Sequence, residues 1–461
     1  MWRNLVLGAW ILCAACGDAP TSQPPLPTPV ASIELGASAE SLLVGHSTLL
    51  SVVLKDSTGA VLTNRPLTWL SRDTSVVIVE GIYGSGSVVS KRSGRTWVIV
   101  TNEALHDSAS IVSGYLFSSV AAGQGHTCGL LVHGELYCWG DNSRGQLADS
   151  QLGFKTSPSP VDSTRRYTTV SLGGAFTCGL TSTDGLYCWG SNELGQVGVG
   201  LSQTVVSTPV QVSGSYRSIN AGQYHACAVA TTGAAFCWGN NTVGELGIGV
   251  ADFDRTAPVQ VNGNIAFRDV SPGYGFTCGL AMSDSIYCWG DNRVGQLGDG
   301  TTTTRYVPAP IASSVAFKQV DAAAGYACGL SVGGELYCWG NMPDTLDQRD
   351  SIPFLAAPSL LFSSIDVSND FACGVTTTAV AVCWGGNHYG NLGTGTSANS
   401  FTPTPIGTTG SFRYVVTGGL HACGLDLSDI IFCWGYNSTG QLGRGFSSQM
   451  DSVPRRVMDQ P

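Results

Sequence analysis

The chain has 461 residues, of which 12% are charged and 43% hydrophobic, with 60 glycines and a formal net charge of -10. This length suggests two or three folding units, and the composition describes a compact, turn-rich protein with β-structure rather than a disordered one. The acidic balance argues against a nucleic-acid partner, because phosphate binding depends on clustered lysine and arginine.

Residues 1–16 have the outline of an export signal peptide, with a positive charge, an apolar run and then Cys16. The run is well below the roughly 20 residues that a membrane-spanning helix needs, and no later stretch reaches that length. Small residues before Cys16 resemble the lipobox of bacterial lipoproteins, although Cys13 stands where that motif usually has leucine. We therefore expect an exported chain: an outer-membrane or cell-surface lipoprotein lipidated at Cys16, with membrane contact only through that lipid, or a secreted protein.

Residues 17–29 are rich in Pro, Ser and Thr and are expected to form an extended tether. From 30 to 114, apolar runs alternate with polar residues at period two, which is typical of a small β-sandwich. The stretch LLVGHSTLLSVVLKDSTGAVL, followed by LTWLSRDTSVVIV and SGRTWVIVT, resembles the group 2 bacterial Ig-like domain, with Trp69 at that family's core tryptophan. The resemblance implies a spacer or adhesion module and names no ligand.

From residue 115 to 461 the sequence repeats about every 50 residues, a period typical of propellers and solenoids. Seven copies align on their cysteines, from VAAGQGHTCGLLVHGELYCWGDNSRGQL to VVTGGLHACGLDLSDIIFCWGYNSTGQLG. They resemble the regulator of chromosome condensation family, whose blades carry Gly-His-Thr, Asp-Gly, Trp-Gly and Gly-Gln-Leu-Gly. The resemblance implies an all-β chain, a seven-bladed β-propeller preceded by the small Ig-like β-sandwich.

The ends of the copies suggest how the ring closes. Each copy ends in a Pro-rich apolar segment, such as PSPV at 158–161 and VPRRV at 453–457. Since no repeat follows the last segment, we expect it to pair with the first blade's strand near 117–121. That pairing would close the ring and remove sheet edges.

Fourteen cysteines form seven pairs, each ten positions apart. Ten positions of extended chain span roughly 33 Å, whereas a disulfide joins Cα atoms roughly 4.4 to 6.8 Å apart. Turns near His133-Gly134 and Asp184-Gly185 would place the cysteines on adjacent antiparallel strands of one blade. We expect structural disulfides, with reduced core thiols as the alternative. A zinc site would need a third and a fourth ligand, and redox catalysis would need a Cys-x-x-Cys motif; the sequence supplies neither. The expected pairs are Cys128 with Cys138, Cys178 with Cys188, Cys227 with Cys237, Cys278 with Cys288, Cys328 with Cys338, Cys373 with Cys383, and Cys423 with Cys433.

Other recurring residues are expected to be structural. A tryptophan follows the second cysteine of every copy and should pack between blades, which leaves none in the propeller for stacking on a sugar. His126, His225 and His421 should be hydrogen-bond anchors of the blades rather than ligands. Six asparagines after Trp-Gly should occupy turns with positive φ; they are Asn142, Asn192, Asn241, Asn292, Asn387 and Asn437.

The loops after each Gly-Gln-Leu-Gly differ in sequence while the blades repeat, as a scaffold that presents a specific surface requires. The fifth copy lacks that motif, so its loop at 342–352 is the first candidate for a ligand. No catalytic triad, phosphate-binding loop, calcium loop or carboxylate pair stands out, and we expect no enzyme activity, cofactor or metal. The candidate binding residues are Met342, Asp344, Asp347, Arg349, Tyr389 and Tyr436.

These features predict a surface-anchored interaction module whose partner is a protein or polysaccharide at the cell surface. The alternative is an inhibitor or enzyme that acts on an envelope or extracellular target. The family's name implies guanine-nucleotide exchange on the small GTPase Ran, together with chromatin binding. An export leader would separate the chain from cytosolic GTPases, and the repeats leave no room for the inserted wedge used in exchange. A secreted bacterial propeller that inhibits β-lactamase through loops on one face is a closer physical analogue.

Overall fold

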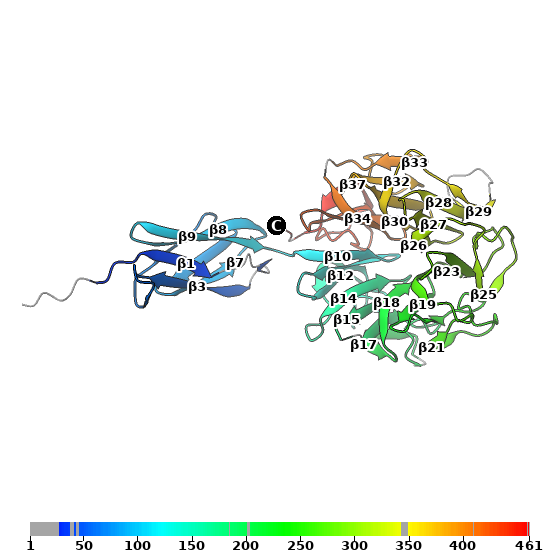
Figure 1. The fold of residues 1–461 in the computed structure, drawn as a ribbon, viewed down its shortest axis with the longest axis horizontal. Coiled ribbons are helices and arrows are strands. Elements are labelled where there is room, and N and C mark those ends of the chain that lie inside the picture. The colour runs from blue at the N-terminus through cyan, green and yellow to red at the C-terminus, as the bar shows by residue number, and fades with distance from the viewer. Residues whose placement is uncertain are drawn as a thin grey trace, which may run out of the picture.

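The computed structural model describes residues 27–36, 41–42, 46–183, 185–200, 203–342, 349–408, 410–458 and 460, and their regular structure is all β-strand. The expected signal peptide and Cys16 lie outside them. No helix in the described residues is long and apolar enough to span a bilayer. The strands form an N-terminal pair of sheets and a ring of seven four-stranded sheets (Figure 1).

The N-terminal pair of sheets is the β-sandwich that the alternating sequence predicts. One sheet has the order β1-β3-β7-β6 with β4 beside β3, and the other has the order β2-β9-β8-β5. Leu50, Val77 and Val88 of the first sheet share a core with Val98 and Ile111 of the second. The assignment of this sandwich to the Ig-like family stays a prediction. The strands are β1 (Ser32–Gly36), β2 (Ser41–Leu42), β3 (Ser47–Lys55), β4 (Val61–Leu62), β5 (Thr68–Ser71), β6 (Val77–Gly81), β7 (Ser85–Ser90), β8 (Gly94–Asn102) and β9 (Leu105–Ser113).

Each repeat folds into its own antiparallel sheet, or blade, with the strands in sequence order from the centre of the ring outward. This confirms the seven-bladed all-β propeller. The blades are β10 (Phe117–Ala122), β11 (His126–Leu131), β12 (Leu136–Asp141), β13 (Phe154–Pro160); β14 (Tyr167–Leu172), β15 (Phe176–Thr181), β16 (Leu186–Ser191), β17 (Val205–Val212); β18 (Tyr216–Ala221), β19 (His225–Ala230), β20 (Ala235–Gly239), β21 (Arg255–Gln260); β22 (Phe267–Pro272), β23 (Phe276–Ala281), β24 (Ile286–Gly290), β25 (Arg305–Pro310); β26 (Phe317–Ala322), β27 (Tyr326–Ser331), β28 (Leu336–Asn341), β29 (Arg349–Leu355); β30 (Phe362–Val367), β31 (Phe371–Thr376), β32 (Ala381–Gly385), β33 (Ser400–Pro405); and β34 (Phe412–Thr417), β35 (His421–Asp426), β36 (Ile431–Tyr436), β37 (Met450–Arg456).

All seven predicted disulfides are present, each joining the second and third strands of one blade. In blade one, Cys128 lies directly opposite Cys138, with their Cα atoms 4.1 Å apart. The reversal between them places Gly134 at a φ of +85°, which glycine adopts without strain. The cysteines are fully buried, so the bonds lie in the core of each blade rather than on a reactive surface. The other six bonds join Cys178 to Cys188, Cys227 to Cys237, Cys278 to Cys288, Cys328 to Cys338, Cys373 to Cys383, and Cys423 to Cys433.

The prediction for ring closure was wrong. β37, which contains most of 453–457, pairs with β36 of its own blade, with Arg456 opposite Phe432, and β10 pairs with β11. The Pro-rich segment of every copy is the outermost strand of that copy's own sheet. Proline is tolerated at an open sheet edge, where its missing N–H removes no ladder hydrogen bond and discourages pairing with another chain.

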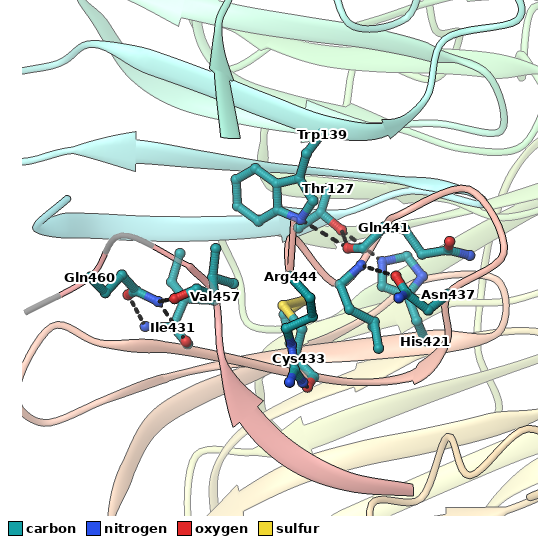
Figure 2. Close-up of a disulfide and its surroundings, with 12 residues drawn as sticks. Thr127, Trp139, His421, Ile431, Cys433, Asn437, Gln441, Arg444, Val457 and Gln460 are labelled. Carbon is teal, nitrogen blue, oxygen red and sulfur yellow. Dashed lines mark hydrogen bonds between the residues drawn. A yellow bond between two sulfur atoms is a disulfide. The ribbon is translucent and has the colours of Figure 1, made fainter. Parts of the chain in front are cut away.

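Side chains rather than a shared strand close the ring between blades seven and one. The Thr127 hydroxyl donates to the Gln441 carbonyl oxygen at 2.8 Å, and the Trp139 indole donates to the same oxygen at 2.9 Å (Figure 2). Nε2 of His421 lies 2.8 Å from the Thr127 hydroxyl oxygen. Because the hydroxyl's one proton goes to the carbonyl, its oxygen must accept from Nε2–H of the histidine.

The same position follows one of two chemical patterns at every blade interface. The first residue of the second strand in one blade faces the second residue of the equivalent strand in the next blade. Where the first of these residues is histidine, the second is threonine; where the first is phenylalanine or tyrosine, the second is alanine. The other two histidine–threonine distances are 2.9 Å and 2.8 Å, which confirms the histidines as blade anchors. The pairs are His126 with Thr177, His225 with Thr277 and His421 with Thr127, and then Phe176 with Ala226, Phe276 with Ala327, Tyr326 with Ala372 and Phe371 with Ala422.

These histidines should make part of the stability acid-sensitive. Burial lowers the pKa of His126 and His225 to about 3 and that of His421 to about 4, from an ordinary value near 6.5. Below about pH 6.5 the unfolded chain binds protons at these sites and the folded chain does not. Each histidine therefore removes up to about 1.4 kcal/mol of stability per pH unit as the pH falls toward its folded pKa.

Replacing the three histidine–threonine pairs by phenylalanine–alanine pairs should flatten the loss of stability between about pH 6.5 and 4.5, measured as the urea midpoint. Exchange of the exposed His133 for Gln provides the control and should leave the slope unchanged. An identical acid slope in the triple-pair variant and the parent would contradict this assignment.

The tryptophans pack between blades as predicted. Six indole N–H groups each donate to a main-chain carbonyl of the preceding blade at 2.9 to 3.0 Å, as in Trp189 to Gln146 and Trp339 to Gln296. The counterpart position for Trp384 falls in 343–348, outside the described residues. The indole therefore both fills the interface and satisfies the Gly-Gln-Leu-Gly backbone of its neighbour.

The six asparagines are structural, but the reason we predicted for them was wrong. None is among the non-glycine residues with positive φ in the described chain. Instead the side chain is buried and shapes the following loop: Oδ1 of Asn142 accepts the N–H of Leu147 at 2.9 Å, and Nδ2 donates to the carbonyls of Asp149 and Gln151. Asparagine is needed for this combined acceptor and donor rather than for its backbone conformation.

Candidate functional site

The blades present two different faces because their strands alternate in direction. The first-to-second and third-to-fourth connections of every blade, such as 123–125 and 142–153, lie at one end, which we call the loop face. The second-to-third turns, such as 132–135, and the blade-to-blade connections lie at the other, the hairpin face. The chain enters at Phe117, opposite Leu131, so the N-terminal sandwich joins the propeller at the hairpin face (Figure 1).

The exposed aromatic side chains of the described propeller all lie on the loop face or at its rim. Phe253 is the most exposed, at 86%. The large hydrophobic side chains exposed on the hairpin face are aliphatic or methionine, such as Val332, Leu427 and Met282. The loop-face aromatics are Phe154, Phe253, Tyr274, Tyr306, Phe401 and Phe446. Since exposed aromatic side chains contribute strongly to protein interfaces, this distribution distinguishes the loop face.

The mouth of the central channel opens on the loop face as a cavity of about 110 Å³. The first-to-second connections meet there so closely that a Cβ added to Gly222 would lie 2.6 Å from the carbonyl oxygen of Gly273. Gln223 donates from Nε2 to Oε1 of Gln124 at 2.8 Å, across the glycines of blade two. Beside them Tyr274 packs edge-on against Tyr224, with ring centroids 5.3 Å apart.

Inside the channel, Asp321 of blade five and Asp366 of blade six line a cavity of about 290 Å³ between the first strands of the blades. Asp321 accepts from the hydroxyl of Ser271 at 2.9 Å and from the N–H of Val367 at 2.7 Å, and Asp366 accepts from the N–H of Thr417 at 2.9 Å. Burial raises the pKa of Asp321 to about 6, and burial together with the nearby Asp321 raises the pKa of Asp366 well above its usual range. Their oxygens thus hold neighbouring blades together.

Among the described residues, no group of three or more His, Cys, Asp or Glu side chains is placed to hold a metal ion.

The predicted binding residues of the fifth copy do not come together as a described site. Met342 is only 4% exposed and packs in the core with Phe362 and Trp384, which corrects the expectation that its side chain meets a ligand. Met342 stands where the other six copies have the buried asparagine, and its apolar side chain packs inward. Asp344 and Asp347 lie outside the described residues, and Arg349 begins β29 with its side chain also outside them.

The structure brings Tyr389 and Tyr436 together on the loop face. Their rings meet edge to face, with centroids 4.8 Å apart and planes at 65°. Tyr389 lines a cavity of about 280 Å³ that also includes Asp370 and His388. These last two residues were not among the predicted binding residues, although each differs from its counterpart in blade one, where Gly125 and Ser143 stand at the equivalent positions.

Comparison with known families agrees with this geometry. A model of the regulator of chromosome condensation (RCC1) repeat matches residues 133–180, 184–229, 232–280, 283–332 and 383–425, and a second model of the same repeat matches 117–146, 167–196, 216–245 and 267–296. The chain belongs to the RCC1 repeat family. This confirms the resemblance seen in the seven copies. No curated protein matches the sequence of the chain.

Several solved structures are similar to this one. Human WBSCR16 has a TM-score of 0.62 at 20% identity, covering 68% of this chain and 87% of its own. Prp20, the yeast RCC1 protein described in complex with Kap60, has a TM-score of 0.63 at 18% identity, covering 70% and 83%. A structure of Prp20p from Saccharomyces cerevisiae, described with its binding properties to Gsp1p and histones, gives 0.63 at 18%, covering 75% and 87%. At these identities the similarity shows the fold alone.

Proposed function

We propose that this RCC1-repeat protein is an exported interaction module that binds a protein partner on the loop face of its propeller. The observation that carries the proposal is the restriction of exposed aromatic side chains to that face and its rim. Aromatic anchors surrounded by polar residues are what protein interfaces use, and the third-to-fourth connections vary while the blades repeat. The N-terminal sandwich joins the opposite face, so a membrane tether would leave the loop face open.

Export is supported by two features of the sequence and fold. Residues 1–16 have the pattern of a signal peptide, and all fourteen cysteines of the propeller are in disulfides. Disulfides persist in oxidising compartments and are rare in the cytosol. Under this proposal the chain does not meet a cytosolic GTPase. The yeast protein Prp20p is described with its binding properties to Gsp1p and histones, and we do not extend these partners to this chain.

An enzyme at the centre of the propeller is less well supported. The channel carboxyls of Asp321 and Asp366 accept hydrogen bonds from neighbouring blades, which explains their presence as structural groups. A binding role for the chain, including inhibition of an envelope enzyme by occlusion, requires only the loop face.

Changing exposed aromatics on the loop face should abolish partner capture. We expect Phe253→Ser with Phe446→Ser to remove the partner that the full chain retains from an envelope extract, because the loss of anchors at an interface costs at least about 2 kcal/mol each. The measurement is quantitative pull-down followed by mass spectrometry. The matched control is Val332→Ser with Leu427→Ser, which changes two exposed side chains on the hairpin face. Equal capture by both double variants would count against the loop face.

A further inference from the structure

We infer that the cavity between blades six and seven is a binding pocket for a cationic side chain, arginine or lysine, presented by the protein partner. This inference rests on the proposed function and adds the chemistry of the contact. The cavity has a volume of about 280 Å³ and lies on the loop face, with Asp370, Tyr389 and Leu420 among its lining residues.

The cavity exists because two positions of the repeat are smaller in blade six. Where Gly386 stands, blade one has Asp141, whose carboxylate accepts from the N–H of Ser143 at 2.9 Å and from Gln146 at 3.0 Å and fills the loop. The glutamine of Gly-Gln-Leu-Gly is also shortened by one methylene, to Asn391. The space that a carboxylate and a longer amide occupy in blade one is therefore open in blade six.

A carboxylate faces this open space. The N–H of Gly386 donates to the carbonyl of Asp370 at 2.7 Å, and a Cβ added to Gly386 would lie 3.6 Å from the Cβ of Asp370. The side chain of Asp370 thus stands beside the position where blade one has its own acid. Asp370 is exposed, and no ion pair involves it in the described part of the chain.

No lysine or arginine of the surrounding chain neutralises Asp370. Residues 350–412, which include all four strands of blade six, contain no lysine or arginine. On the neighbouring blade seven, Arg444 and Arg455 both pair with Asp451, and Arg413 pairs with Asp429. An incoming cation would therefore meet an uncompensated negative charge in a partly enclosed space, where the attraction is stronger than in bulk water.

An aromatic ring completes a site suited to a cation. Tyr389 lines the cavity, and Tyr436 of blade seven packs edge-on against it, which restricts the ring that a ligand would meet. Arginine and lysine bind favourably over such rings, and a carboxylate beside the ring adds an ion pair. The volume lies just below the roughly 300 to 1,000 Å³ of small-molecule pockets, so one side chain fits better than an extended ligand.

The inference can be tested on the purified full chain without knowledge of the partner. The probe is Nα-acetyl-arginine methylamide, with the lysine analogue as a second cation and the citrulline analogue as a neutral isostere, and binding is measured by ligand-observed NMR. We expect saturable binding of both cations that weakens with added salt, and binding of the citrulline probe that is weaker by roughly 10-fold or more.

Two variants locate the binding. Asp370→Asn removes the charge, and Gly386→Ser restores the small polar side chain found at this position in blade two, so each should weaken arginine binding by about 10-fold while leaving the thermal midpoint unchanged. Asp141→Asn makes the same charge change in blade one and should have no effect on arginine binding. Arginine binding that survives both variants, or equal binding of arginine and citrulline, would overturn the inference.

Capture of the partner separates this inference from the proposed function. If the partner is retained equally by the parent and by Asp370→Asn, the loop face binds it without this pocket. If the probe binds as expected while no partner is retained, the pocket stands and the interaction role does not.

Discussion

Replacing His225 by Phe should destabilise the propeller by about 1–3 kcal/mol. Phenylalanine cannot donate to the Thr277 oxygen, which accepts from Nε2–H of the histidine at 2.8 Å in the fully buried interface. The ring must also fit against a hydroxyl and a methyl group where the chain's own phenylalanine interfaces have only alanine. The measurement is the free energy of unfolding from urea titration.

Adding Thr277→Ala to that variant should recover most of the loss. Thr277 also donates to the Glu245 carbonyl, but that carbonyl still accepts from the indole N–H of Trp289 at 2.9 Å once the hydroxyl is removed. The interface between blades four and five has the natural pair of Phe276 with Ala327, and the Gln296 carbonyl there accepts from the indole N–H of Trp339 in the same way. The double-mutant cycle should give a favourable coupling of about 1–2 kcal/mol between positions 225 and 277.

The reciprocal exchange provides the control. Phe276→His alone should destabilise, because a buried histidine would face alanine, and Ala327→Thr should restore stability. Additive effects at both interfaces, with no coupling, would show that the pairing of residue types around the ring has no energetic basis.

Loss of a single disulfide should be at least as costly. Cys278→Ala with Cys288→Ala opens one closed loop within blade four, and the chain-entropy model assigns about 3 kcal/mol to a loop of this size. The midpoint of urea unfolding should fall accordingly, and the blade should become the first region to exchange its amide hydrogens.

Reductant serves as the control for this effect. When unfolding is measured in excess dithiothreitol, the parent loses its own cross-links and the gap between parent and variant should narrow. Alkylation of the native parent without reductant should leave all fourteen propeller cysteines unmodified in an intact-mass spectrum. A native parent that is readily alkylated, or a variant with an unchanged midpoint, would contradict a stabilising role.

Repetition made most of the propeller predictable. Any one copy is an ambiguous run of short apolar segments, but seven copies fix the positions that recur, and recurrence identifies Cys128 and Cys138, the indole that follows and the interface histidines. The constant spacing between cysteines determines the strand pairing within a blade. Local pattern and covalent geometry are sufficient for these features.

Relations between copies were less accessible. The sequence does not distinguish a segment that pairs with its own blade from one that pairs with the next, because both give the same alternation, and so the closure by 453–457 was assigned wrongly. Met342 was taken for a surface residue because the broken motif hid its relation to the core. Gly386 drew no attention, since a missing side chain becomes a cavity only when the neighbouring Asp370 and Tyr389 are placed around it.

Because the ring closes without exchanging a strand between blades, one sequence repeat corresponds to one complete sheet. A blade such as 117–160 carries all four of its strands and its own disulfide, so recombination at blade boundaries could add, remove or circularly permute blades without cutting through a sheet. The matched histidine–threonine and aromatic–alanine pairs then limit which blade can follow which. Blades can thus be exchanged as whole units, but only where the interface residues of the new neighbours match.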